Sequence, residues 1–243
     1  MDQAAQLELI RDLRERTRQI ETPALAPQAG RAGESSHALR DLLAGRGLAP
    51  GTLVEWQGTG EGSGAASLAL SVASQVLRDG GACVVIDATR EFYPPGAACL
   101  GVRPEQTIVV RPPDSRSGLW AWEQSLRSGA VSVTLGRVDG LNERHFQRLQ
   151  LAAEAGGRLG FFLRGPSDRA GPSRAAVRVR VSGRPSRGPL YPLTRRLRVE
   201  LLHCRGGAAG KVIEVELGHE TNHVCLVSEL ADPAPPPRRM AYA

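Results

Sequence analysis

The residues with the clearest chemical meaning form a glycine-rich stretch near the start of an apolar core pattern. Its members are Gly58, Gly60, Gly62, Gly64, Ala65 and Ala66. The stretch follows an apolar run that predicts a buried strand, and it precedes a helical pattern from Ala65 to Leu77. A strand, a glycine-rich turn and a helix bring backbone N–H groups and a helix N-terminus to one point. The first expectation is therefore a loop with the shape of a phosphate site.

The side chains that would make this loop a working nucleotide site are absent. A functional loop reads G-x-x-x-x-G-K-[ST], in which the lysine reaches the phosphates and the hydroxyl binds Mg²⁺. Here Gly64 is followed by Ala65 and Ala66, and Thr59 stands where the first glycine belongs. Phosphoryl transfer depends on the positive charge that the lysine and Mg²⁺ supply to the transition state. We therefore predict a nucleotide-loop remnant with no catalytic residue, metal or cofactor, although its backbone leaves weak ATP binding open.

The elements around the loop predict one βαβ unit. The first strand contains Leu53, Val54 and Trp56, and the second strand, Cys83 to Ile86, ends at Asp87. Ligands of open α/β sheets bind at the carboxyl ends of such strands, so Asp87 completes the predicted remnant site. Tyr93 follows shortly after and precedes two prolines. Its ring could stack on a base, but we expect it to pack this loop against the core.

The order of these motifs resembles RecA-fold proteins. The similarity has no gap from Gly64 to Asp87, and it continues through Leu100 to Val102 and Val109 to Asp114. It implies an α/β fold of the RecA-like P-loop type, with a mostly parallel central sheet flanked by helices and antiparallel C-terminal edge strands. It also shows two further losses. Thr89 replaces the catalytic glutamate of the family, and Gly136 replaces the Walker B aspartate.

Within this superfamily the chain resembles ImuA-like proteins and, more distantly, SulA-like cell-division inhibitors. The segments concerned are Leu159 to Arg164, Arg195 to Leu217 and Leu226 to Ala234. The resemblance implies a non-catalytic adaptor in SOS-induced mutagenic translesion DNA synthesis. It implies an ImuB-type Y-family-like protein and a DnaE-type polymerase as partners. A RecA-like DNA-dependent ATPase and a SulA-like inhibitor that acts by protein binding are the alternatives.

Arginines near the C-terminal half could bind single-stranded DNA. The candidates are Arg164, Arg169, Arg174, Arg184 and Arg187. The first three lie in a Gly- and Pro-containing loop, at the place where RecA-like proteins carry their second DNA-binding loop. Guanidinium groups on such a loop can follow a phosphate backbone, yet no aromatic residue accompanies them to stack on bases. A DNA contact and a solvated connection therefore both remain open.

Composition limits what can be expected of the surface charge, of membrane segments and of the cysteines. The net charge is +6 and Lys211 is the only lysine, so the positive charge reflects either an arginine-rich genome or a basic surface. No apolar run approaches the about 20 residues of a membrane span, which predicts a cytoplasmic protein without a membrane segment. The cysteines contain no C-x-x-C pair, and we expect buried thiols rather than a zinc site. They are Cys83, Cys99, Cys204 and Cys225.

The predicted organisation is one core with two extensions. Residues 1–34 form an N-terminal helix and a flexible linker, residues 35–231 the RecA-like core, and residues 232–243 a disordered tail rich in proline and arginine. Trp120 and Trp122 lie two positions apart on a predicted helix of residues 118–127, and hence on different faces. At least one of them should be exposed.

Overall fold

The structure is a computed structural model that describes residues 43, 48–137, 141–165, 175–185, 194–205, 209–218 and 224–228. All of these belong to one compact unit, Ala32–Ala243. The predicted N-terminal helix and linker and the predicted tail lie outside the described residues, so their organisation stays a prediction.

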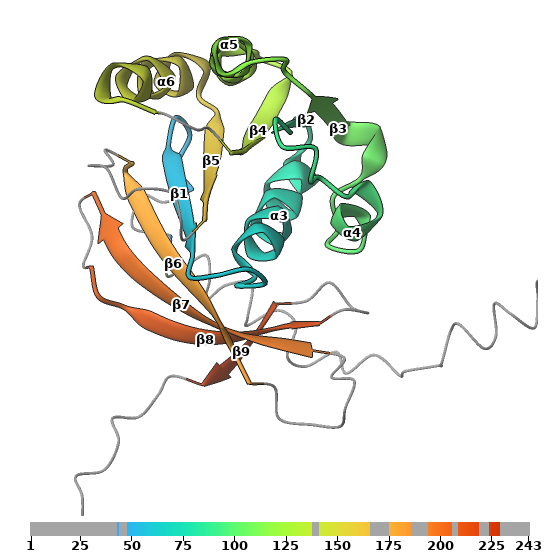
Figure 1. Cartoon of the computed structure of the whole chain (residues 1–243), viewed down its shortest axis with the longest axis vertical. Coiled ribbons are helices and arrows are strands. Elements are labelled where there is room, and N and C mark those ends of the chain that lie inside the picture. Colours follow the sequence, from blue (N-terminus) through green and yellow to red (C-terminus); the bar gives the residue numbers. More distant parts are fainter. Residues whose placement is uncertain are drawn as a thin grey trace, which may run out of the picture. The chain divides into compact units, whose positions relative to one another are not determined.

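A nine-stranded sheet runs through the described part in the order β3-β2-β4-β5-β1-β6-β7-β8-β9 (Figure 1). The six strands from β3 to β6 in this order pair in parallel. They are β1 (Leu53–Gly58), β2 (Ala82–Ile86), β3 (Thr107–Val110), β4 (Val131–Gly136), β5 (Leu159–Arg164) and β6 (Val177–Arg184). The remaining strands pair antiparallel, namely β7 (Thr194–Cys204), β8 (Val212–Gly218) and β9 (Val224–Ser228). The predicted fold class is confirmed.

Helices cover both faces of the parallel part (Figure 1). The segments are α3 (Ala65–Val76), η1 (Leu77–Asp79), α4 (Pro94–Ala98), η2 (Pro104–Gln106), α5 (Ser115–Arg127) and α6 (Glu143–Gly156). Helix α3 shares a core cluster with one face, whereas α5 and α6 share a second cluster with the other. Asp114 and Asn142 begin the latter two helices, because their side chains accept the backbone N–H groups of Ser117 and His145. Among the described helices, none has the length and apolar character needed to cross a membrane.

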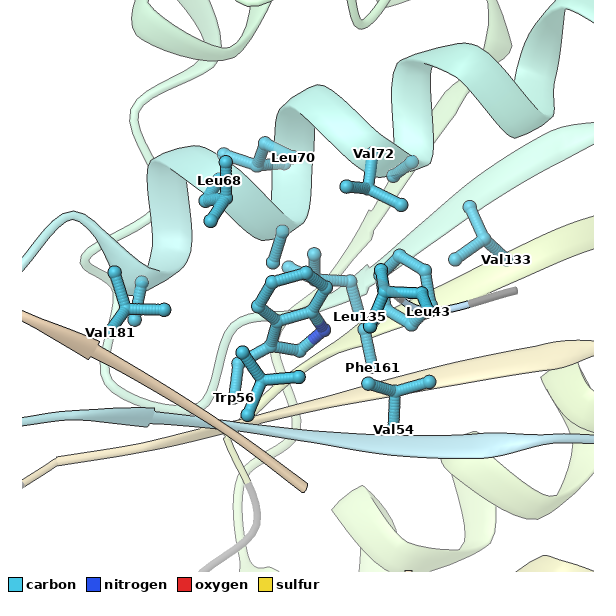
Figure 2. Packing of buried hydrophobic residues seen from close by; sticks show 14 of the residues in the cluster. Leu43, Val54, Trp56, Leu68, Leu70, Val72, Val133, Leu135, Phe161 and Val181 are labelled. Carbon is cyan, nitrogen blue, oxygen red and sulfur yellow. The ribbon is translucent and has the colours of Figure 1, made fainter. Parts of the chain in front are cut away.

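Aromatic side chains fill the centre of each cluster. Figure 2 shows Trp56 of β1 between the strands and α3, and its ring centroid lies 5.8 Å from that of Phe161. On the opposite face Trp122 stacks on Phe162 at 4.4 Å. Trp122 is fully buried while Trp120 is 63% exposed, so the prediction that these two tryptophans face different ways is confirmed. These contacts fix the sheet between its two helical layers.

Two local predictions are wrong. Tyr93 is 69% exposed instead of packing its loop against the core. Its ring lies against Gly96 of the short helix that follows, because a Cβ added there would be 2.9 Å from the ring carbon Cδ1. Cys99 is also exposed, since it ends the same helix, whereas Cys83 and Cys204 are buried as expected.

Candidate functional site

A cavity of about 690 Å³ opens at the carboxyl ends of the parallel strands and the start of α3. It is lined by every residue predicted for the remnant, namely Gly58, Gly60, Gly62, Gly64, Ala65, Ala66 and Asp87. The βαβ unit therefore brings these residues together in the position where open α/β sheets bind ligands, and their role as a nucleotide-loop remnant stays a prediction. Much of the remaining wall is apolar and includes Leu70, Leu100 and Leu135. Binding of a nucleotide or another cofactor here stays untested.

The glycine loop keeps a compact turn. Gly62 and Gly64 adopt positive φ angles of 66° and 85°, which favour glycine. The N–H of Ser63 donates to the carbonyl oxygen of Gly60 at 3.2 Å. Gly64 is the N-cap of α3 and provides no side-chain cap. The loop therefore turns tightly into the N-terminus of α3, the kind of position where anions bind, while its side chains contribute no cation.

Two residues of β7 hold this loop in place. The Arg195 guanidinium donates a hydrogen bond to the carbonyl oxygen of Gly62. A Cβ added at Gly64 would lie 2.5 Å from Cδ2 of Leu197, so this leucine packs directly against the loop. Sequence alone did not point to Arg195, because it lies 133 positions after Gly62 and only the sheet topology brings it back.

Both carboxylate oxygens of Asp87 contact neighbouring residues of the protein. This aspartate is 5% exposed, and its Oδ1 accepts the N–H groups of Glu91 at 2.9 Å and Phe92 at 3.2 Å. Its Oδ2 lies 3.2 Å from Nε of Arg111. Oδ1 therefore organises the turn after β2, in which Arg90 has a left-handed φ of 59°, and Oδ2 ties this turn to the residue after β3. Asp87 thus lies in the predicted site, but its contacts are those of a residue that stabilises a loop.

Gly136, where the RecA resemblance predicts a Walker B aspartate, has no room for a side chain. It ends β4, pairs with Ile86 of β2 and is buried. A Cβ at this position would lie 2.4 Å from the Ile86 carbonyl oxygen, a separation that side chains do not tolerate. Thr89, where the RecA resemblance predicts a catalytic glutamate, also lines the cavity. In the described part of the chain, no three His, Cys, Asp or Glu side chains are grouped to hold a metal.

A buried carboxylate that the sequence did not single out lies in the first strand. Glu55 is 1% exposed, and its oxygens are 3.8 Å from Nε of Arg164 and 3.6 Å from Nε of Arg178. Gln57 also donates to it. The neighbouring strands supply both arginines, because Glu55 pairs with Arg178 and Gln57 with Arg164. A charged residue within an apolar strand was the available signal, but its partners follow only from strand order.

The arginines predicted to bind DNA do not form one described cluster. The Arg164 side chain is 14% exposed and faces Glu55, so little of its charge is available to a phosphate. Arg184 is 42% exposed, with its Nε 3.8 Å from Oε1 of Glu214. Arg169, Arg174 and Arg187 lie outside the described residues. DNA binding by this set stays a prediction.

The cysteines offer a direct check of the cavity geometry. Burial raises the pKa of the Cys83 thiol to about 12, so this group stays protonated and unreactive at pH 8. Cys99 lines the cavity and is exposed. In a Cys225→Ser background, maleimide at pH 8 should label Cys99 and leave Cys83 unmodified, as measured by peptide mass spectrometry of the native protein. Equal labelling of both thiols would contradict the arrangement.

The fold and the loop after its first strand define a RecA-like protein. A family model for the RecA N-terminal domain matches residues 28–143. The crystal structure of the RadB recombinase superposes with a TM-score of 0.59 over 75% of this chain and 94% of that chain, at 16% identity, and so supports the fold alone. RecA of Nostoc punctiforme is 36% identical over 102 residues, which are 42% of this chain and 28% of that protein.

A longer match specifies the family. Protein ImuA of Caulobacter vibrioides (strain NA1000 / CB15N) is 33% identical over 169 residues, which cover 64% of this chain and 69% of that protein. The chain belongs to the ImuA family. This confirms the resemblance found in the order of the sequence motifs.

Proposed function

We propose that this protein is a non-catalytic RecA-like adaptor in damage-induced mutagenic translesion DNA synthesis. Its proposed partners are an ImuB-type Y-family-like protein and a DnaE-type polymerase, and its membership of the ImuA family supports this role. One observation carries the non-catalytic part. The cavity lies where a nucleotide would bind, but the charged side chains of a working site are missing. Ala65 and Ala66 stand in place of the lysine and the metal ligand, and Thr89 and Gly136 in place of the catalytic glutamate and the Walker B aspartate.

The acidic residues that remain around the cavity do not replace the missing ones. Asp87 pairs with Arg111, and Glu91 lies 3.6 Å from Nη1 of Arg137. Glu61 is an exposed residue on the glycine loop itself. Phosphoryl transfer needs a positioned metal and a residue that orients the nucleophile. An arginine such as Arg195 can contribute positive charge, but it can neither hold a metal ion nor orient the nucleophile. The adaptor is therefore favoured over the ATPase alternative.

The SulA-like alternative shares the absence of catalysis and differs only in the partner. An adaptor for DNA synthesis supports damage-induced mutation, whereas an inhibitor of cell division does not. The two are therefore separated by a genetic readout. Single-stranded DNA remains a proposed additional ligand, and its contacts would include arginines outside the described part of the chain.

A substitution at the loop tests the adaptor in cells. Ala66 is exposed at the second position of α3, so Ala66→Glu places a carboxylate where a phosphate would bind. A negative charge in the first helical turn is compatible with folding. A deletion strain that carries Ala66→Glu should keep its ultraviolet-induced mutation frequency within about twofold of wild type, because one charge in the first turn has only a small effect on stability.

Ala66→Gln is the matched neutral control for this measurement. Loss of induced mutation with Ala66→Glu but not with Ala66→Gln, at equal protein levels, would show that an anion must occupy the loop. That outcome would contradict the adaptor proposal and favour the nucleotide-dependent alternative.

A further inference from the structure

Helices α5 and α6 lie side by side on one face of the sheet (Figure 1). They run parallel to each other, because each one connects two parallel strands. Their C-terminal ends are in close contact, since a Cβ added at Gly156 would be 2.0 Å from the carbonyl oxygen of Leu126. Nearer their N-termini, Arg148 of α6 forms an ion pair with Glu123 of α5. The outer sides of the two helices therefore form one continuous surface.

Two rows of side chains line this surface. Residues three and four positions apart lie on the same side of a helix. The row on α5 contains Arg116, Trp120, Glu123 and Arg127, and the row on α6 contains Arg144, Arg148 and Leu151. The ion pair between Glu123 and Arg148 places the two rows next to each other. These seven residues are called the α5–α6 seam below.

The α5–α6 seam is basic. It contains four arginines and one carboxylate, that of Glu123, whose side chain is 12% exposed. This carboxylate already pairs with Arg127 at 3.0 Å and with Arg148. The side chains of these two arginines remain 56% and 58% exposed, so they keep N–H donors for a further carboxylate. The charge of the seam is therefore complementary to an acidic partner.

The acidic residues of α6 itself lie on its other flank. Glu143 and Glu154 share a row with Gln150, because their spacings of seven and four positions return to the same side of the helix. Gln150 donates to Glu154 at 2.8 Å and to the carbonyl oxygen of Gly51 at 3.0 Å. This flank thus faces the residues before β1, away from α5, and its carboxylates do not reduce the positive charge of the seam.

The seam also exposes two large apolar side chains. Trp120 and Leu151 are each 63% exposed. Trp120 lies three residues before Glu123, and Leu151 lies three residues after the arginine that pairs with this glutamate. The parallel helices thus place the two apolar side chains roughly 9 Å apart along the seam, at 1.5 Å per residue. A bound helix with apolar residues every three or four positions can contact both.

We propose that the α5–α6 seam binds an acidic amphipathic helix of a partner protein. The apolar side of that helix covers Trp120 and Leu151, and its carboxylates pair with the arginines of the seam. Side chains of a third helix can pack between the ridges of two neighbouring helices. Single-stranded DNA fits less well, because Leu151 offers no ring on which a base can stack. The inference rests on the proposed adaptor function and deepens it by naming the surface and the chemistry of the partner.

The test titrates the full chain with an unlabelled helical peptide that has leucines three and four positions apart, glutamates on both flanks and no aromatic residue. Trp120 is the exposed one of the three tryptophans, since Trp56 and Trp122 are buried. Binding at the seam should therefore shift the tryptophan emission to shorter wavelength and protect it from quenching by acrylamide. The change should saturate at micromolar peptide and weaken as salt is added. A scrambled peptide of the same composition should cause no such change.

Three substitutions locate the binding surface, with affinities measured by calorimetry. Trp120→Ala should weaken peptide binding at least about tenfold, because it removes the aromatic anchor. Arg144→Glu should weaken binding about fivefold or more, because it places a like charge opposite the glutamates. Arg78→Glu is the matched control, since this exposed arginine lies in η1 on the side of α3. Its affinity should stay within about twofold of wild type, because salt screens a charge so far away.

The proposal would be overturned by the absence of a saturable change with wild type, by equal binding of the scrambled peptide, or by unchanged affinity of Trp120→Ala and Arg144→Glu. Binding of oligo-dT that Trp120→Ala abolishes, without peptide binding, would assign the seam to DNA. A dimer in sedimentation that Trp120→Ala dissociates would assign it to a second copy. Thermal midpoints check the fold, and Arg144→Glu carries the test if Trp120→Ala unfolds. The Ala66 variants test the adaptor function separately, so the two proposals can fail independently.

Discussion

Gly136→Asp, which restores the acid of the Walker B position, should destabilise the protein and create no magnesium site. The added Cβ would lie 2.4 Å from the Ile86 carbonyl oxygen, so β4 and β2 must separate. The new carboxylate would also be buried beside that oxygen. Overpacking and an uncompensated charge together should lower the free energy of unfolding by about 3 kcal/mol or more.

Urea unfolding measures the stability change, and calorimetric titration with MgCl₂ measures metal binding. Gly136→Ala is the matched control, because it introduces the same Cβ without the charge and should lose less stability. A Gly136→Asp protein as stable as wild type that binds Mg²⁺ would show that the strands can open for an acidic ligand. The cavity would then be closer to a working nucleotide site than the geometry indicates.

Glu55→Ala should cost about 3 kcal/mol of stability, because it leaves two guanidinium groups without their carboxylate in a largely buried place. Arg164 and Arg178 are 14% and 25% exposed, and Glu55 is the carboxylate that they share. Strands β5, β1 and β6 meet at this cluster. The loss should therefore appear as a lower midpoint in urea unfolding, followed by the fluorescence of the tryptophans, of which Trp56 and Trp122 are buried.

Glu200→Ala provides the control for this prediction. Glu200 lies 3.6 Å from Nη1 of Arg180, but the two side chains are 32% and 46% exposed. Solvent screens such a pair, and its loss should cost under about 1 kcal/mol. Equal effects of the two substitutions would mean that the Glu55 cluster contributes no more than an ordinary surface ion pair.

Local sequence patterns were sufficient to predict that the glycine loop and Asp87 lie together, and to predict much of the sheet. The run from Leu53 and the helix from Ala65 begin at the predicted residues, because each element is specified by its own apolar pattern. The glycines and Asp87 lie together because one βαβ unit carries them. The resemblance to the RecA superfamily supplied the parallel order that periodicity could not.

Contacts between distant strands could not be predicted from the sequence. Arg195 and Leu197 meet the glycine loop only because β7 follows β6 across the sheet, and Arg178 meets Glu55 only through the β1–β6 register. The exposure of Tyr93 depends on the position of the five-residue helix α4 that follows it. The steric reason for glycine at position 136 likewise needs the position of Ile86.

The measurement that tests the central claim most directly is titration of the purified full chain with Mg·ATP, by calorimetry and by phosphate release, with and without single-stranded DNA. The account predicts no phosphate release and no binding in the micromolar range under either condition, because the cation and metal ligands of the loop are absent. Micromolar binding with DNA-stimulated phosphate release would contradict the account and identify the protein as a RecA-like ATPase.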